Sequence, residues 1–364
     1  MKQICPLLNE LLHFAVDRGA SDLHLVCGHP PTLRIEGDLV TIDQREPLNG
    51  EQTKEMVYSI LNDEHVRKFE EEWELDLSVA IPDLSRFRLN LYISKDNIEA
   101  AFRVVGLRVK QPEELGLPLV VAEFCRKPSG LVLVTGPTGV GKTTTMNSMI
   151  DLINRERSCR IVIIEDPIEF IHSHKKSVII QREVYSDTKT FANALKHTLR
   201  QDPNVICVGE MRDLETIQTA MIAAETGHLV LATLHTPDAV QTIDRIIDVF
   251  PPHAQTQIRI VLSSCIQGVI SQQLLPRIDG KGRVLSTEVL CATPALRNVI
   301  REAKTEQIPT IIQTSADMGM QLMDTCLTEL YAKGIISYET ALSRVKDIQH
   351  FKAMLMKSGK RHLL

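Results

Sequence analysis

The chain has 364 residues, of which 43% are hydrophobic and 24% are charged, and its formal net charge is −5 at pH 7. That length and composition predict two folded domains, each with its own core, and exclude a largely disordered chain. The acidic balance and the lack of a long lysine and arginine tract argue against a large nucleic-acid-binding surface. No apolar run reaches the roughly 18 residues that span a bilayer.

The first hundred or so residues have the pattern of a small α+β domain. Apolar residues recur at helical spacing between Leu7 and Val16, which predicts an amphipathic helix. Residues 19–39 alternate apolar and polar positions around a Pro-Pro turn, and residues 86–93 and 99–107 continue that alternation. Because this alternation is typical of half-buried strands, we expect an antiparallel sheet within residues 1–110.

A different pattern begins near residue 129. Short continuous apolar runs (LVLV, IVII, VICV and LVLA) alternate with helical stretches, as buried parallel strands and their crossover helices do. The sequence QPEELGLP separates the two patterns, and the last fifty residues carry helical periodicity with few strand signals. We therefore expect an α/β fold with a linker at residues 111–125, a nucleotide-binding domain at 126–310 and a helical lobe at 311–364.

Cysteine usage points to a reducing compartment. The eight cysteines are scattered without a CxxC pair, so the sequence predicts neither a zinc site nor a disulfide framework. The N-terminal stretch carries polar residues inside any candidate signal core, which also favours a cytoplasmic protein.

The segment GLVLVTGPTGVGKTTT, residues 130–145, carries the most specific motif in the chain. Gly136, Gly141, Lys142 and Thr143 satisfy the pattern G-x-x-x-x-G-K-[ST]. Glycines allow backbone N–H groups to curl around phosphate oxygens, the lysine reaches the β- and γ-phosphates, and the threonine hydroxyl binds Mg²⁺. Because an apolar run precedes this loop and a helical stripe follows it, we expect a bound nucleoside triphosphate at a helix N-terminus.

Carboxylates follow two of the other apolar runs. IVII runs into Glu165, Asp166 and Glu169, and VICV ends at Gly209 and Glu210. In an open parallel sheet the carboxyl ends of the strands meet beside the phosphate loop, so one acid could orient the attacking water and another could hold the metal shell. The alternative is that these acids cap helices or lie in solvated turns.

Two histidines flank the apolar run LVLATLHT, residues 229–236. His228 precedes this run and His235 lies near its end. A histidine at a strand end can contact the γ-phosphate or bridge to a neighbouring strand, but a structural role is equally compatible with the sequence. Their spacing of seven is no metal-binding signature.

Eight segments together resemble one family. They are ASDLHL, GPTGVGKTTT, IIEDPIEF, QREV, RQDPNVICVGEMRDLET, AAETGHLVLATLHT, TIDRIIDVFP and GMQLMDTCL. In this order they resemble the secretion and type IV pilus ATPases, and above all the twitching-motility retraction motors. The resemblance covers residues 19 to about 345. It implies a PAS-like N-terminal domain and a RecA-like ATPase domain with a helical C-terminal lobe.

The resemblance also implies roles for individual residues. Glu165 to Glu169 match the Asp box, Glu210 the atypical Walker B acid, and His228 and His235 the His box; Glu169 and Glu210 are the acids tied to hydrolysis, with Thr143 and Glu210 at the metal. Nucleotide contacts are implied for the Walker A residues Gly136, Pro137, Thr138, Gly139, Val140, Gly141, Lys142, Thr143 and Thr144. In this family arginines of the N-terminal sheet reach a neighbour's phosphates, and Arg86, Arg88 and Arg103 match those positions.

From the same resemblance we expect a homo-hexameric ATPase that uses ATP and Mg²⁺ at the cytoplasmic face of the inner membrane. Its partners would be the membrane platform protein of the pilus and a paralogous retraction ATPase. The segment ALRNVIRE, residues 295–302, resembles a helix of retraction motors, and Thr293 with Pro294 supplies a helix start. Arg297 and Arg301 would share one face of that helix, suited to an acidic partner or a neighbouring subunit.

Other functions stay open at this point. The chain could be the main retraction motor or its accessory paralogue, and a pilus extension or type II secretion ATPase is the nearest alternative. A RecA-type nucleic-acid motor would also carry the phosphate loop, although the acidic balance counts against it. A GTPase would need an N/T-K-x-D segment after the loop, and none is present. A regulatory module that binds nucleotide without turnover is the remaining class.

Overall fold

The computed structural model describes residues 4–35, 37–42, 45–81, 84–105 and 109–357. The chain divides into two compact units: Met1–Arg108 with Glu169–Ile171, and Val109–Ile168 with His172–Leu364. We call them the N-terminal unit and the ATPase unit. Among the described residues, no helix has the length and apolar character needed to cross a membrane.

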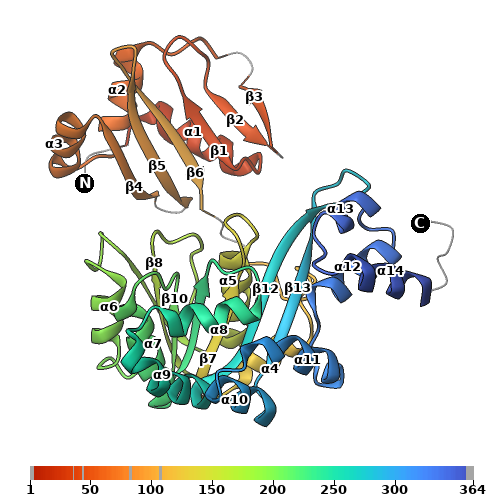
Figure 1. The fold of residues 1–364 in the computed structure, drawn as a ribbon. Coiled ribbons are helices and arrows are strands. Elements are labelled where there is room, and N and C mark those ends of the chain that lie inside the picture. The colour runs from red at the N-terminus through yellow and green to blue at the C-terminus, as the bar shows by residue number, and fades with distance from the viewer. Residues whose placement is uncertain (1–3, 36, 43–44, 82–83, 106–108, 358–364) are drawn as a thin grey trace. The chain divides into compact units, whose positions relative to one another are not determined.

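The N-terminal unit is a six-stranded sheet packed against helices (Figure 1). Its strand order is β3-β2-β1-β6-β5-β4, and every neighbouring pair is antiparallel. The elements are α1 (Pro6–Asp17), β1 (Asp22–Leu25), β2 (Thr32–Ile35), β3 (Asp38–Thr41), α2 (Gly50–Tyr58), α3 (Asp63–Glu72), β4 (Glu74–Ile81), β5 (Ser85–Ser94) and β6 (Asn97–Val104). The α+β fold expected for this part of the chain is confirmed.

Alternating burial explains why these residues form a sheet. In β5, Phe87, Leu89 and Leu91 are buried, whereas Arg86 and Arg88 point to the other face. The β5–β6 hairpin turns at Lys95 and Asp96, whose φ angles are 48° and 61°. Two consecutive left-handed residues form the tight turn that suits the twist of paired strands.

The ATPase unit is built on a seven-stranded sheet in the order β13-β12-β7-β11-β10-β8-β9. The strands are β7 (Gly130–Thr135), β8 (Arg160–Glu165), β9 (Val178–Glu183), β10 (Val205–Val208), β11 (Leu229–Leu234), β12 (Ile266–Pro276) and β13 (Arg283–Cys291). All neighbours are parallel except the β12–β13 pair. The four parallel strands expected from the apolar runs are thus confirmed, and β7, β10 and β11 are buried along their whole length.

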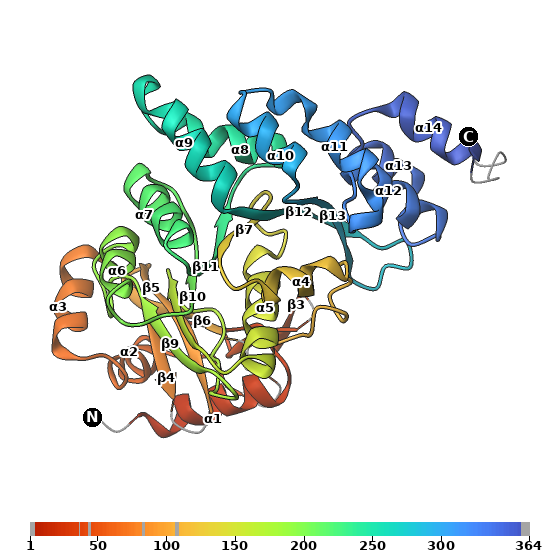
Figure 2. The same cartoon turned by 90° about the horizontal axis from the view of Figure 1, so that it is seen from below.

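Helices cover both faces of this sheet, with α4 and α5 on one side of β7 and α7 and α9 on the other (Figure 2). They are α4 (Val120–Arg126), α5 (Lys142–Glu156), α6 (Phe191–Thr198), α7 (Leu214–Glu225), α8 (Ala239–Asp248), α9 (Pro252–Cys265), α10 (Pro294–Arg301) and α11 (Ile308–Thr314). Short 3₁₀ turns lie at Thr305–Gln307 and Ala316–Met318. The C-terminal lobe holds α12 (Met323–Ala332), α13 (Tyr338–Leu342) and α14 (Ile348–Lys357).

Two segments differ from their predicted roles. Residues 111–125 were expected to form a linker, but Leu117, Val121 and Phe124 belong to the core of the ATPase unit. Ile312 and Met320, expected in the helical lobe, belong to that same core. The lobe has a separate core, made of Leu275, Met323, Leu327, Leu330, Tyr331, Ile336, Ala341, Phe351 and Leu355. Residues 358–364 of the predicted lobe lie outside the described residues.

A close contact between α4 and β12 gives a test of this packing. A Cβ atom on Gly268 would lie 2.3 Å from Cζ of the buried Phe124 ring. We expect Gly268→Ala to lower the free energy of unfolding by about 1–3 kcal/mol, because overpacking forces the ring to move. Adding Phe124→Leu should recover part of that loss, and urea unfolding of the single and double variants measures it. Strictly additive losses would contradict the contact.

Candidate active site

The phosphate loop connects the end of β7 to the start of α5. Gly136, Gly139 and Gly141 have φ angles of 137°, 82° and 88°, which L-residues with side chains rarely adopt. A Cβ atom on Gly136 would also lie 2.5 Å from the backbone oxygen of Gln272 on β12. Glycine at position 136 is therefore required both by the backbone conformation and by the close approach of a neighbouring strand.

The loop ends at the open N-terminus of a long helix. α5 has 15 residues, its N-cap is Gly141, and no side chain among the described residues caps it. The first turn carries no acidic residue. Helix N-termini present unpaired N–H groups and a positive partial charge. This end of α5 therefore fits a phosphate group, which agrees with the motif.

Lys142 lies at the base of the loop and is 8% exposed. Its Nζ donates hydrogen bonds to the carbonyl oxygens of Gly136 (2.8 Å) and Pro137 (2.9 Å). Burial lowers the pKa of Lys142, whereas the negative charge of Glu210 acts in the opposite direction. Oxygen acceptors thus already surround this ammonium group, and phosphate oxygens are stronger acceptors of the same kind.

Glu210 lies two residues beyond the end of β10. Its Oε1 is 3.1 Å from Nε2 of His235, and its Oε2 accepts a hydrogen bond from Arg212 Nη2 at 2.7 Å. Burial opposes ionisation of this carboxyl, but the hydrogen bond and positive charge of Arg212 and the hydrogen bond from His235 outweigh it and hold its pKa below the ordinary value. Glu210 is therefore a carboxylate at neutral pH.

His235 joins the loop to that carboxylate. It follows β11 and contacts Glu210 through Nε2, while Nδ1 lies 3.4 Å from both Thr138 Oγ1 and Lys142 Nζ. These contacts suit the tautomer in which Nε2–H donates to the carboxylate and Nδ1 accepts from the loop. The structure thus brings together four predicted residues, and we call Thr138, Lys142, Glu210 and His235 the loop cluster.

Glu165 and Glu169 have different surroundings. Glu165 ends β8, is 2% exposed, and accepts a hydrogen bond from Gln181 Nε2 at 3.3 Å. Glu169 is half-buried and lies in Glu169–Ile171, which is grouped with the N-terminal unit. It is not among the residues that the ATPase unit gathers at the loop, so its catalytic role stays a prediction.

The structure does not bring His228 to the loop, although the resemblance implied a site role for both histidines. His228 precedes β11, and its backbone oxygen accepts a hydrogen bond from Gly130 at the start of β7. A six-residue parallel strand spans roughly 20 Å, so His228 lies at the opposite edge of the sheet. Its Nδ1 lies 2.9 Å from the carbonyl oxygen of Ala223, near the end of α7. This contact is structural.

The three predicted arginines share one face of the N-terminal sheet. Arg86 and Arg88 lie two residues apart on β5, so their side chains project from the same face of the sheet. Arg88 lies directly opposite Arg103 on β6. Like charges placed opposite each other on paired strands destabilise a sheet. The carboxylate of Asp22 offsets this in part, because its Oδ1 accepts a hydrogen bond from Arg103 Nε at 2.8 Å. The arrangement produces a basic face that suits an anion.

Two residues at the site were missed by sequence analysis. Arg212 lies two residues after Glu210, a spacing that could have identified it as the partner of the carboxylate. Gln272 donates a hydrogen bond from Nε2 to Thr145 Oγ1 at 2.7 Å and is fully buried. It lies on β12, more than a hundred residues along the chain, so no local signal in the sequence indicated it.

The helix α10 begins as predicted, but one of its arginines has another role. Thr293 accepts a hydrogen bond from Leu296 N at 3.1 Å, which confirms the cap. Arg297 was expected to face a partner; instead its Nη1 donates to the carbonyl oxygens of Ser263 and Ser264, and Nη2 to that of Ile266. Arg297 therefore caps the C-terminal end of α9, where a cation is favourable.

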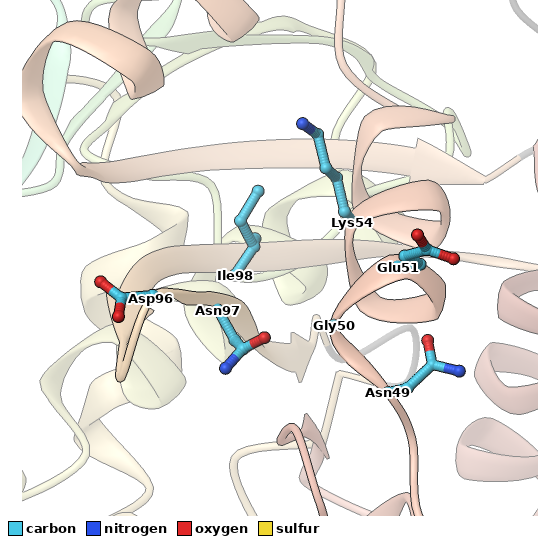
Figure 3. A pocket seen from close by; sticks show the side chains of 7 residues that line it. All are labelled: Asn49, Gly50, Glu51, Lys54, Asp96, Asn97 and Ile98. Carbon is cyan, nitrogen blue, oxygen red and sulfur yellow. The ribbon is translucent and has the colours of Figure 1, made fainter.

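A pocket in the N-terminal unit has a different character (Figure 3). It is lined by Asn49, Gly50, Glu51, Lys54, Asp96, Asn97 and Ile98. Asn49 and Gln52 exchange two hydrogen bonds of 2.9 Å as a capping box of α2, and Asn97 donates to the carbonyl oxygen of Lys95 at 2.8 Å. These polar groups stabilise a helix start and a hairpin, which gives the pocket a structural explanation.

The comparison with known proteins agrees with this geometry. Residues 95–336 match the family model described as type II/IV secretion system protein. The type IV pilus retraction ATPase PilT of Pseudomonas aeruginosa is 48% identical over 344 residues, which cover 94% of this chain and 99% of that protein. The type IV pilus ATPase PilU of the same organism is 37% identical, covering 95% of this chain and 90% of that protein.

A solved structure matches over the whole fold. The crystal structure of the pilus retraction motor PilT with bound ADP superposes with a TM-score of 0.89 at 46% identity, covering 96% of this chain and all of that one. The matches extend through both units and include the phosphate loop. The chain therefore belongs to the type II/IV secretion system protein family, as a relative of its pilus retraction ATPases.

Proposed function

We propose that this chain is an ATP-hydrolysing motor that drives retraction of a type IV pilus by withdrawing pilin subunits. The loop cluster is the observation that carries the proposal. It places an ammonium group, an imidazole and an ionised carboxylate at the N-terminus of α5, where a triphosphate would end. The similarity to the retraction ATPase PilT of Pseudomonas aeruginosa supports retraction as the work that hydrolysis drives.

In this proposal the residues of the loop bind and orient ATP. Lys142 exchanges the carbonyl oxygens of Gly136 and Pro137 for phosphate oxygens, and the N–H groups of α5 bind the same charge. The oxygens of Thr143 and Glu210 suit Mg²⁺, which would neutralise charge on the β- and γ-phosphates when bound. Glu169 is the base that orients and deprotonates the attacking water.

His235 is well placed to respond to the γ-phosphate. Its ring contacts Glu210 on one side and the loop residues Thr138 and Lys142 on the other. A phosphate that draws Lys142 away removes a donor from Nδ1 of the imidazole, so the ring moves between two sets of partners. Hydrolysis would thereby change the contacts that His235 makes at the edge of the sheet where Glu210 lies.

Assembly and location form the second part of the proposal. We propose a homo-hexamer in which Arg86, Arg88 and Arg103 bind the phosphates held by a neighbouring subunit, as their shared basic face suits an anion. The ring would act at the cytoplasmic face of the inner membrane, on the platform protein at the base of the pilus. The similarity to PilU favours one alternative, an accessory retraction ATPase working beside a paralogue.

Removing the proposed catalytic carboxylates should abolish turnover. We expect Glu210→Gln and Glu169→Gln each to lower kcat for ATP hydrolysis by roughly 100-fold or more, because neutral amides neither deprotonate water nor hold the metal shell. Steady-state phosphate release measures the effect. Glu306→Gln, at an exposed position of the ATPase unit, is the matched control and should leave kcat unchanged. Full activity of Glu210→Gln and Glu169→Gln would refute the proposed chemistry.

Nucleotide binding should depend on the lysine of the loop and on Mg²⁺. We expect ADP with Mg²⁺ to raise the melting temperature of the wild-type chain, because a ligand that binds the folded state stabilises it. Lys142→Ala should lose most of this shift, since it removes the ammonium group that lies at the loop carbonyls. Chelation of Mg²⁺ should stop hydrolysis in the wild type. Equal shifts in the wild type and Lys142→Ala would contradict the binding site.

A cell that carries the same Lys142→Ala allele tests the motor. Loss of retraction should leave an excess of surface pili and no twitching motility, whereas failure of extension would leave no pili. Pilus counts and surface motility distinguish these outcomes. Normal retraction in that strain would contradict the proposed work of the motor.

A further inference from the structure

The segment Gln181–Glu183, part of the QREV motif, has no role in the site described above. These residues form the end of β9, which pairs in parallel with β8 so that Gln181 lies beside Ile163 and Glu183 beside Glu165. Successive side chains of a strand point to opposite faces, so Gln181 and Glu183 project from the same face. The amide oxygen of Gln181 and the carboxylate of Glu183 are therefore two hydrogen-bond acceptors on one face of β9, two residues apart.

Glu183 holds the chain just before Glu169. It is 3% exposed, and its Oε2 accepts a hydrogen bond from the backbone N–H of Ile168 at 3.0 Å. Its other oxygen, Oε1, accepts a hydrogen bond from Ser186 Oγ at 3.2 Å. The hydrogen bond from Ser186 thus orients the Glu183 carboxylate, and the carboxylate holds the backbone of Ile168.

Gln181 holds the chain just after Ile171. Its Oε1 accepts a hydrogen bond from the backbone N–H of His172 at 2.9 Å. Its Nε2 donates to Glu165 Oε2 at 3.3 Å, which orients the amide. The two side chains of β9 therefore bind the backbone on either side of Glu169–Ile171.

A third attachment connects His172, the residue that follows this segment, to the phosphate-loop helix. His172 Nε2 lies 2.6 Å from Asn147 Oδ1, and Asn147 Nδ2 donates to the carbonyl oxygen of Thr143 at 2.9 Å. Burial lowers the pKa of His172 to about 4, so at neutral pH the ring is uncharged and donates its Nε2–H to Asn147. The returning end of the segment is thus joined to α5 one turn beyond the proposed metal ligand.

We propose that Gln181 and Glu183 are positioning residues that hold the backbone at both ends of Glu169–Ile171 and so restrict the position of the residue that carries the Glu169 carboxylate. We call these two residues the β9 clamp. The inference rests on the proposed function, in which Glu169 activates water. A base on a loop acts efficiently when its position is fixed in advance, and small displacements of a reacting group cost large factors in rate.

The test uses three variants that keep the shape of the side chain. Gln181→Met and Glu183→Met remove the acceptor oxygens, whereas Glu183→Gln keeps one oxygen able to accept from Ile168. We expect both Met variants to lower kcat for ATP hydrolysis by roughly 10- to 100-fold, with KM for ATP changed by less than about twofold. Glu183→Gln should retain kcat within about threefold of wild type. Val178→Ala, an exposed position on the same strand, is the matched control.

Binding of ADP and thermal unfolding are measured on the same variants. A fall in kcat with an unchanged ADP-induced shift in melting temperature, together with rescue by Glu183→Gln, supports the clamp. An unchanged kcat in both Met variants overturns it. It is also overturned if kcat, ADP binding and melting temperature fall together and Glu183→Gln behaves like Glu183→Met, because the two residues would then serve only the fold.

Failure of this inference is distinguishable from failure of the proposed function. If Glu169→Gln is inactive while the Met variants hydrolyse ATP normally, the clamp is wrong and the catalytic assignment stands. If Glu169→Gln is fully active, the assignment of the base is wrong and the clamp has nothing to position.

Discussion

The parallel register of β7, β11 and β10 is the constraint on which the site depends. Thr135 pairs with Leu234 and Ala232 pairs with Val208, so these strands end at one edge of the sheet. The loop begins directly after Thr135, and His235 follows Leu234. Backbone pairing therefore brings the lysine, the imidazole and the carboxylate of Glu210 together. Because these strands are buried, a slip in register would break the core as well as the site.

Sequence analysis predicted the strands β7, β10 and β11, whose ends form this edge, but it missed the adjoining strand β12. Strands buried on both faces have continuous apolar runs, and these runs predicted the central parallel strands. β12 was missed although Ser271 and Gln272 on it are fully buried. Ser271 Oγ accepts a hydrogen bond from Thr135 Oγ1 on β7 at 2.9 Å, and Gln272 Nε2 donates one to Thr145 Oγ1 on α5 at 2.7 Å. Polarity that is satisfied by distant residues cannot be recognised from a local pattern.

The direction of β11 explains why His235 lies at the phosphate loop and His228 does not. His228 precedes β11 and His235 follows it, and in a parallel sheet those ends lie at opposite edges. This information was in the sequence, since the phosphate loop also follows its strand. Arg297 is the contrary case: nothing in its own helix indicates that its guanidinium caps the end of α9. Tertiary contacts alone give that residue its role.

The edge that carries His235 is also held by the C-terminal lobe. α8 begins at Ala239, whose N–H donates to Glu288 Oε1 at 2.9 Å, and Oε2 of the same carboxylate accepts from Met323, the first residue of α12, at 3.4 Å. Beside it, Lys346 Nζ donates to Asp238 Oδ2 at 2.5 Å. Burial raises the pKa of Glu288, and the two amide donors counteract it in part. Two helix N-termini converge on one buried carboxylate, so the start of α8 cannot move without changing the cap of α12.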